Sequence, residues 1–345
     1  MVRNFWISVV LCVSFYAGAQ NTVEKEQELE TVVVTAQYKK TTKEKAVHKI
    51  KVIDRKTIDA MAAVTLKDVL VNQNNIRVAQ DNVLGSSMSL QGISGQNIKI
   101  LIDGIPVIGR LNGNIDISQI NLNTIEQIEI VEGPLSVNYG TDALAGTVNL
   151  ISKKSKKDGV SSTLNSYYEN IGQYNVDGSV SIKEGNSGVI LSLGRNFFDG
   201  WNANDDFFEF PKSRPADSFR YKQWKPKEQY FSRLSYHYTK SNFSFSPYLS
   251  YFNEKITNRG LPRPPYEEIA FDDYYNSWRV DVGFDLRYTF KNRSAFNVKA
   301  AYNDFKRIKN TFVKDLTTLE QELSQTEGSQ DTTKFDLLMS RGTWN

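Results

Sequence analysis

The sequence predicts a mainly β fold in which a small α+β domain precedes a long antiparallel sheet of the membrane-barrel kind. Residues 97–153 contain short apolar stretches separated by glycine turns, which indicates a compact domain of short strands. After Gly159, apolar and polar residues alternate along much longer stretches. Short and long polar connections alternate between those stretches, as they do in transmembrane β-barrels.

The composition excludes several classes of protein. Lys and Arg total 42 against 39 Asp and Glu, and this balance, a net charge of +3, does not favour nucleic-acid binding. Cys12 is the one cysteine, and His48 and His237 are the two histidines, so neither a disulfide framework nor a multi-histidine metal site is expected. The residues show no catalytic constellation, and we expect no cofactor.

The N-terminal residues 1–19 predict a secretory signal peptide, with Arg3 ahead of an apolar core and small residues at 17–19. That core is shorter than the ~20 residues of a membrane-spanning helix. Residues 20–44 form a polar, flexible segment that contains a β-branched run. The run is Glu30, Thr31, Val32, Val33, Val34, Thr35 and Ala36. It favours an extended conformation, either as a first strand of the domain or as a segment that pairs with a partner by strand addition.

Residues 45–153 predict the α+β domain. Asp54 can cap a short helix after the first strand. The next helix should bury the face formed by Leu66, Val69 and Leu70. Alternating isoleucines predict a strand at 98–102, and the pair Asp103-Gly104 is a strong hairpin-turn signal.

This domain resembles the plug domain of TonB-dependent outer-membrane receptors. The family's LIDG-P signature is matched at Leu101, Ile102, Asp103, Gly104 and Pro106. Its second signature is matched at Ile125, Glu126, Ile128, Glu129, Glu132, Gly133, Pro134, Ser136, Tyr139, Gly140, Ala143, Gly146 and Asn149. Matches in this order over about fifty residues are a specific signal.

The resemblance implies a plug inside a transmembrane barrel of about 22 strands. Residues 30–36 then correspond to the TonB box, which pairs with the partner protein TonB. TonB uses the inner-membrane proton gradient to pull on the box and partly displace the plug. Such a receptor lies in the outer membrane of a Gram-negative bacterium, contacts its lipid and imports a scarce extracellular ligand. No bond of the ligand is made or broken, so we expect a transporter and not an enzyme.

Two departures from the family pattern concern the way in which the plug is held. Many members carry arginines where this sequence has Gln91 and Gln127. Those arginines form ion pairs with glutamates of the barrel wall. Neutral glutamine can still donate a hydrogen bond but carries no charge, so we expect other residues to lock this plug, if it is locked at all.

The second half predicts part of the barrel. Residues 154–159 form a charged linker, and 160–345 the N-terminal part of a transmembrane barrel whose apolar face contacts lipid; a soluble sandwich would instead bury that face. About eight strands are expected, near 160–169, 173–183, 187–197, 227–239, 242–253, 277–290, 294–306 and 334–341. Long connections are expected at 198–226, 254–276 and 307–333.

About eight strands are too few to enclose a plug of roughly a hundred residues. We therefore expect the sequence to be the N-terminal portion of a longer receptor, the alternative being a truncated, non-functional remnant. An unpaired last strand is unstable in lipid because its amides have no partners. Expressed alone, the chain should give no heat-resistant folded barrel.

The ligand is less well specified. Loops at 80–88 and 107–115 are of the kind that contact ligand in the family, so candidate ligand-binding residues are Met88, Arg110, Asn112, Asn114 and, on a barrel strand, His237. A ferric siderophore or other iron chelate is favoured, with cobalamin or haem next. Asp199, Asn202, Asn204 and Asp206 are a weak calcium candidate, with a solvated loop as the alternative. A passive porin or adhesin and a soluble β-sandwich binding protein remain as rival classes.

Overall fold

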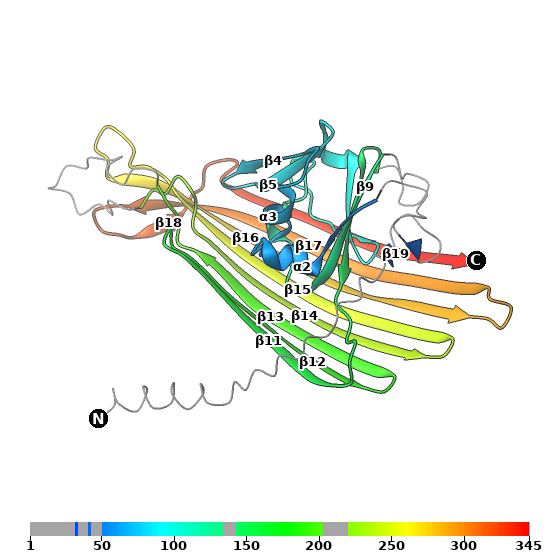
Figure 1. Ribbon diagram of the computed structural model, residues 1–345. Helices are drawn as coiled ribbons and strands as arrows, with labels where there is room; N and C mark the ends of the chain where they lie inside the picture. The colour runs from blue at the N-terminus through cyan, green and yellow to red at the C-terminus, as the bar shows by residue number, and fades with distance from the viewer. Residues whose placement is uncertain (1–31, 34–40, 43–49, 134–142, 203–219, 345) are drawn as a thin grey trace, which may run out of the picture.

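The computed structural model describes residues 32–33, 41–42, 50–133, 143–202 and 220–344. It consists of a small domain, residues 50–152, which we call the plug, and a large antiparallel sheet, which we call the wall. Figure 1 shows the plug lying against one face of the wall. The prediction of an α+β domain ahead of a long antiparallel sheet is therefore confirmed. No helix in the described ranges is long and apolar enough to cross a membrane.

The N-terminal predictions fall largely outside the described residues. The expected signal peptide at 1–19 lies there entirely, as does most of the flexible segment at 20–44. Within that segment, β1 (Val32–Val33) pairs antiparallel with β2 (Thr41–Thr42). Part of the predicted TonB box is therefore extended and already engaged in a short backbone ladder.

The plug is built around a mixed sheet of short strands. In the described part, this sheet has the order β3 (Ile50–Asp54), β9 (Ile125–Glu132), β10 (Gly146–Ser152), β7 (Ile98–Ile102) and β8 (Ile105–Pro106). β10 and β7 run parallel, and the other neighbours are antiparallel. A second sheet joins β4 (Ile76–Asp81), β5 (Gly85–Leu90) and β6 (Ile93–Ser94).

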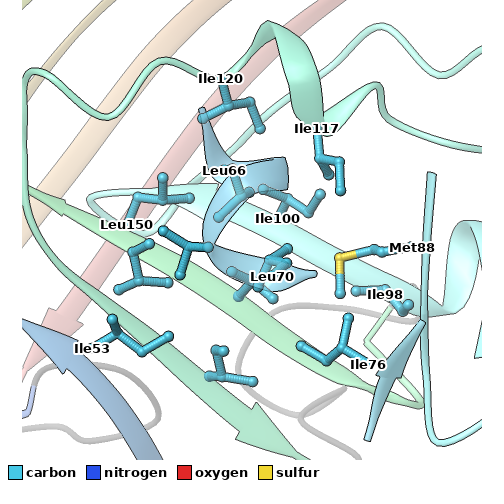
Figure 2. Packing of buried hydrophobic residues seen from close by; sticks show 14 of the residues in the cluster. Ile53, Leu66, Leu70, Ile76, Met88, Ile98, Ile100, Ile117, Ile120 and Leu150 are labelled. Carbon is cyan, nitrogen blue, oxygen red and sulfur yellow. The ribbon is translucent and has the colours of Figure 1, made fainter. Parts of the chain in front are cut away.

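Short helices close the plug core. They are α2 (Arg55–Ala60), α3 (Leu66–Leu70), η3 (Gly95–Asn97) and η4 (Ile117–Gln119). Asp54 caps α2 as predicted, since its side chain accepts from the Thr57 backbone N–H at 2.8 Å. The predicted face of α3, Leu66, Val69 and Leu70, is fully buried. Figure 2 shows Leu66 and Leu70 packed among side chains of both plug sheets and η4.

The wall contains, among the described residues, a sheet of nine antiparallel strands. They are β11 (Gly159–Glu169), β12 (Gln173–Glu184), β13 (Ser187–Phe198), β14 (Lys227–Lys240), β15 (Phe243–Arg259), β16 (Ile269–Thr289), β17 (Ala295–Asp315), β18 (Gln321–Leu323) and β19 (Gln330–Trp344). Each strand pairs with the next, except that β18 and β19 both pair with β17. All eight strands expected from alternation are present, and β18 is an additional short one.

The expected long connections at 254–276 and 307–333 are wrong in extent. β15 runs on to Arg259, which pairs with Asp272 of β16, and β17 runs on to Asp315, which pairs with Ile269. The ladders continue past the apolar alternation because backbone hydrogen bonds, unlike burial, do not require an apolar face. The connections shrink to 260–268 and 316–329, whereas 199–226 remains long.

The two faces of the wall differ as predicted. One cross-strand row on the face away from the plug is apolar and exposed from β12 to β19. It consists of Val180, Leu191, Leu234, Leu249, Val282, Tyr302 and Leu338, each at least 42% exposed. The neighbouring row, on the side of the plug, contains Arg233, Asp281 and Asn303. This arrangement suits lipid outside and polar contacts inside.

Candidate functional site at the boundary of plug and wall

Polar contacts join the plug to the wall near both ends of the strands in the described part. We call one end the short-turn end, because turns at 185–186, 241–242 and 290–294 lie there. The opposite end, with connections 199–226, 260–268 and 316–329, is the long-connection end. The plug thus contacts the polar face near both of its ends.

At the short-turn end, the contacts converge on the turn between β7 and β8. Asp103 and Gly104 form this turn with φ of 52° and 81°, in agreement with the hairpin prediction. The Asp103 Oδ2 atom accepts from Arg233 Nη2 of β14 at 3.2 Å. Lys299 of β17 donates to the Asp103 carbonyl at 2.7 Å, and Arg341 of β19 donates to the Gly104 carbonyl at 2.9 Å. Three strands of the wall therefore place a cation on one plug turn.

The same carboxylate is tied to the plug itself. Ser152, at the end of β10, donates to Asp103 through its backbone N–H at 2.9 Å and through its hydroxyl at 2.6 Å. Burial raises the pKa of Asp103, but the Arg233 guanidinium and the two Ser152 hydrogen bonds outweigh it, so the pKa lies below its ordinary value. Asp103 is accordingly an anion at neutral pH.

At the long-connection end, a carboxylate of the wall meets neutral groups of the plug. Glu254 of β15 accepts from Gln119 Nε2 of η4 at 2.8 Å and from Gln229 Nε2 of β14 at 2.7 Å. Lys227 Nζ lies 3.5 Å from Glu254 Oε2, the oxygen that Gln229 contacts, and 3.2 Å from Ser118 Oγ. Arg307, on β17, donates to the carbonyl of residue 83 at 2.9 Å. These bonds hold η4 and the loop at residue 83 of the plug against the wall.

The motif residues of the predicted plug signature act mainly within the plug. The Asn149 Oδ1 atom accepts from the Gly104 N–H at 3.0 Å, and a Cβ at Gly146 would lie 2.3 Å from the Val131 carbonyl. Glu129 is fully buried, Pro106 is the last residue of β8, and Gly133 follows β9 with φ of 100°. Glu126 forms an ion pair with Lys156 of the linker. Pro134, Tyr139 and Gly140 lie outside the described residues.

The two glutamines that replace family arginines contact plug glutamates. Gln91 Nε2 donates to Glu132 Oε2 at 2.9 Å, and Gln127 Nε2 donates to Glu129 Oε1 at 2.7 Å. The wall contacts described above come from other residues. Charge on the wall side of these contacts is carried by Arg233, Lys299 and Arg341 at one end. At the other end it is carried by Glu254, Lys227 and Arg307.

The candidate ligand-binding residues are not gathered in one place. Met88, Arg110 and Asn114 line one small hollow of the plug, but Met88 is 5% exposed and packs in the hydrophobic core. Arg110 donates to the carbonyls of Gly95, Ile98 and Gly113, so it braces its own loop. The Asn114 side chain donates to the Asn112 carbonyl at 3.2 Å.

His237 lies away from that hollow. It pairs with Gly188 close to the short-turn end, and its Nδ1 atom lies 3.1 Å from Ser246 Oγ of the neighbouring strand. The expectation of a ligand surface that includes the buried Met88 side chain does not fit this structure. The burial of Met88 follows from its position on β5, whose alternate residues face the core of the plug.

The calcium candidate is also poorly supported. The Asn202 side chain donates to the Tyr221 carbonyl at 3.0 Å and accepts from the Gln223 N–H at 2.6 Å, so both of its polar atoms serve the loop. Asp199 lies at the start of this connection, whereas Asn204 and Asp206 lie outside the described residues. Within the described ranges, no group of three or more His, Cys, Asp or Glu side chains could hold a metal ion.

Sequence reasoning missed the wall residues that touch the plug. The alternation of strands did place Arg233 and Lys299 on a polar face. Which of many polar residues meets the plug depends on strand register and on the docking of the domain, and neither is encoded in a local pattern. The one available signal was that Asp103 belongs to a matched plug motif.

An α+β plug docked on the polar face of an amphipathic antiparallel sheet is the arrangement expected for part of a plugged membrane barrel. A family model of the TonB-dependent receptor plug domain matches residues 42–147. The chain accordingly contains a plug domain of the kind found in TonB-dependent receptors. The predicted plug domain and the predicted fold are both confirmed.

Solved structures with a similar fold include the pyoverdine outer-membrane receptor FpvA of Pseudomonas aeruginosa bound to pyoverdine. Its identity to this chain is 13% and the TM-score is 0.57, over 88% of this chain and 48% of that one. The FrpB iron transporter of Neisseria meningitidis has 13% identity and a TM-score of 0.56, over 86% and 49% of the two chains. The FpvAI–pyocin S2 complex has 14% identity and a TM-score of 0.54, over 91% and 52%. The chain spans about half the length of these structures.

Proposed function

We propose that this chain functions in an outer-membrane receptor that imports a scarce ligand with energy supplied through TonB. The observation that carries the proposal is the plug domain, held by side-chain contacts against the polar face of an amphipathic wall. A passive porin needs no such plug. The exposed apolar row of the wall supports a location in lipid, with residues 1–19 directing export.

Residues 30–36 serve as the TonB box in this proposal. Val32 and Val33 already form backbone pairs with Thr42 and Thr41, so this segment can take part in a β-ladder. Strand addition uses the same backbone groups, and TonB would add to the segment or replace the β2 partner. A pull on the box reaches the plug first at β3, the edge strand of its larger sheet.

An iron chelate, most simply a ferric siderophore, is the proposed ligand, with cobalamin or haem next. The proteins of similar fold support this choice, since one is bound to pyoverdine and another is named as an iron transporter. Arg110, Asn112 and Asn114 of the 107–115 loop remain the proposed plug contacts, and His237 is the proposed contact on the wall. Ligand would enter at the long-connection end, since outer loops are the longer ones in such barrels.

The test is uptake of a radiolabelled ferric siderophore by cells that produce the receptor carrying this chain. Deletion of residues 30–36 should abolish uptake but leave surface binding of the chelate, and loss of TonB should have the same effect. Deletion of residues 20–26 is a matched control of equal length in the same polar segment, and it should leave uptake intact. Uptake that persists without residues 30–36 would instead indicate a passive pore.

A further inference from the structure

The plug turn at Asp103 is held by the wall with the charges reversed relative to the pattern that the family resemblance implies. There, cationic plug residues meet carboxylates of the wall, but here Gln91 and Gln127 occupy those plug positions and bind plug glutamates. The anion belongs to the plug, and the cations Arg233, Lys299 and Arg341 belong to the wall. We propose that Asp103 is the positioning residue that retains this plug in its wall.

Two of these cations, Arg233 and Lys299, also contact other residues of the wall. The Arg233 guanidinium lies over the Tyr248 ring, 4.3 Å from its centroid, and Lys299 Nζ is 2.9 Å from Asp285 Oδ2. The side chains of Arg233 and Asp103 are only 11% and 24% exposed, so water screens their attraction little. Preorganised, partly desolvated charges of this kind contribute more than surface pairs do.

The position of the turn in the plug sheet determines which edge of the plug the contact retains. The sheet order is β3, β9, β10, β7 and β8, so the strand nearest the TonB box and the Asp103 turn lie at opposite edges. Ser152, which also binds Asp103, ends β10 immediately before the linker to the wall. A pull that starts at β3 can therefore loosen one edge while the Asp103 turn keeps the other edge in the wall.

This inference rests on the proposed function, because retention matters only if the plug is displaced. Its consequence is that import opens a path beside the plug on the β3 side, and the β7–β8 hairpin leaves last. Arg233, Lys299 and Arg341 hold the plug in the resting receptor. They are positioning residues and need not touch the ligand.

The test is single-molecule pulling on the N-terminus of the full receptor in a bilayer, with neither TonB nor ligand present. Asp103→Asn and Arg233→Gln should each raise the rate of plug extraction at fixed force about tenfold. The double variant should be no faster than the faster single variant, because the two residues form one interaction. Lys299→Gln should give a smaller increase.

Two controls separate retention from stability of the plug itself. Arg195→Gln removes a wall arginine whose carboxylate partner, Glu228, is on the wall, and it should leave the rate unchanged. Ser152→Ala removes only a hydrogen bond inside the plug, so it too should leave the extraction rate unchanged. Unchanged extraction in Arg233→Gln and Lys299→Gln, both of which leave the plug sequence intact, would overturn the proposal, as would an equal increase in Arg195→Gln. Neither result would bear on uptake, which is measured separately.

Discussion

The Gln119 side-chain amide donates to the Glu254 carboxylate at 2.8 Å, across the boundary between plug and wall. Glu254 is 1% exposed and also accepts from Gln229, with Lys227 at 3.5 Å. A buried carboxylate needs such donors, since an unpaired buried charge is costly. The plug thus supplies a neutral donor to a wall anion whose charge is balanced from within the wall.

Glu254→Ala should therefore destabilise the receptor strongly. The substitution removes the acceptor of Gln119 and Gln229 and the carboxylate partner of Lys227, so we expect the free energy of unfolding to fall by about 3 kcal/mol. Denaturant titration of the purified protein measures this. Glu228→Ala, which breaks the exposed pair with Arg195, is the matched control and should cost less than about 1 kcal/mol. Equal losses in the two variants would contradict the importance of the Glu254 contacts.

A second buried pair fixes the long connection after β13. Arg220 forms a two-pronged bond with Asp272 of β16 at 2.9 and 3.0 Å, and it also donates to the Gly260 carbonyl. Arg220→Lys keeps the charge and the trypsin site but cannot reproduce the planar fork. We expect trypsin to cleave after Lys222 several-fold faster in this variant, in native conditions, than in the original protein. An unchanged cleavage rate would show that the fork does not anchor the connection.

Much of this fold could be predicted because alternation reports which face of a strand meets an apolar environment. All eight expected wall strands are found, since residues such as Leu234 and Val282 alternate with polar neighbours. The extensions of β16 and β17 were missed, because there the ladder is held by backbone bonds with no apolar alternation to reveal it. Backbone pairing leaves little trace in side-chain pattern.

The site could be predicted only in part. Asp103 was recognised as a motif residue, yet its partners Arg233, Lys299 and Arg341 lie at least 130 residues away in the sequence. Their contacts depend on how the plug docks, and charge alone does not identify them among many wall cations. Met88 was assigned to a ligand loop from its neighbours, whereas the strand phase of β5 turns it into the core.

The lowered pKa of Asp103 predicts an acid-dependent loss of stability. A carboxylate with a depressed pKa in the folded state contributes stability above its unfolded pKa of about 3.9, and loses it as the pH falls through the folded value. The contribution should be complete above about pH 5 and should decline below about pH 4. Unfolding titrations across this range should show a steeper acid loss in the original protein than in Asp103→Asn.

Other charged or titratable groups near Asp103 also affect the pH profiles of the original protein and of Asp103→Asn. Arg233 and His237 of β14, Tyr248 of β15, Lys299 of β17 and Arg341 of β19 are the charged or titratable groups that lie toward the turn. Each is present in both proteins, so the part of its titration that does not depend on the Asp103 charge cancels in the difference. Identical pH profiles for the two proteins would show that the Asp103 charge does not stabilise the folded state.

Gly109 is expected to tolerate no side chain, because its backbone lies directly against an aromatic ring of the wall. It has φ of 101°, and an added Cβ would lie 2.8 Å from the ring of Phe305, a fully buried residue of β17. Gly109→Ala should lower the free energy of unfolding by about 2–4 kcal/mol, from backbone strain and overpacking together. Gly113→Ala shares the positive φ, at 79°, but meets nothing within 4 Å, so it reports strain alone. Phe305→Leu should recover part of the loss in Gly109→Ala, and equal losses in the two alanine variants would contradict the contact.

Leu249→Arg tests whether the outer face of the wall meets hydrocarbon. Leu249 lies in the middle of the exposed apolar row, 47% exposed, between Leu234 and Val282. Arginine there should cost about 2–4 kcal/mol when the receptor folds into lipid vesicles, because its charge must enter the bilayer. In water, an exposed leucine changed to arginine would alter stability by only about 0.5 kcal/mol.

Leu323→Arg is the matched control: Leu323 is 45% exposed on β18, at the long-connection end, and should lie beyond the hydrocarbon. Folding free energies measured by denaturant titration in vesicles should separate the two variants, and equally small costs would mean that the apolar row is covered by something other than lipid.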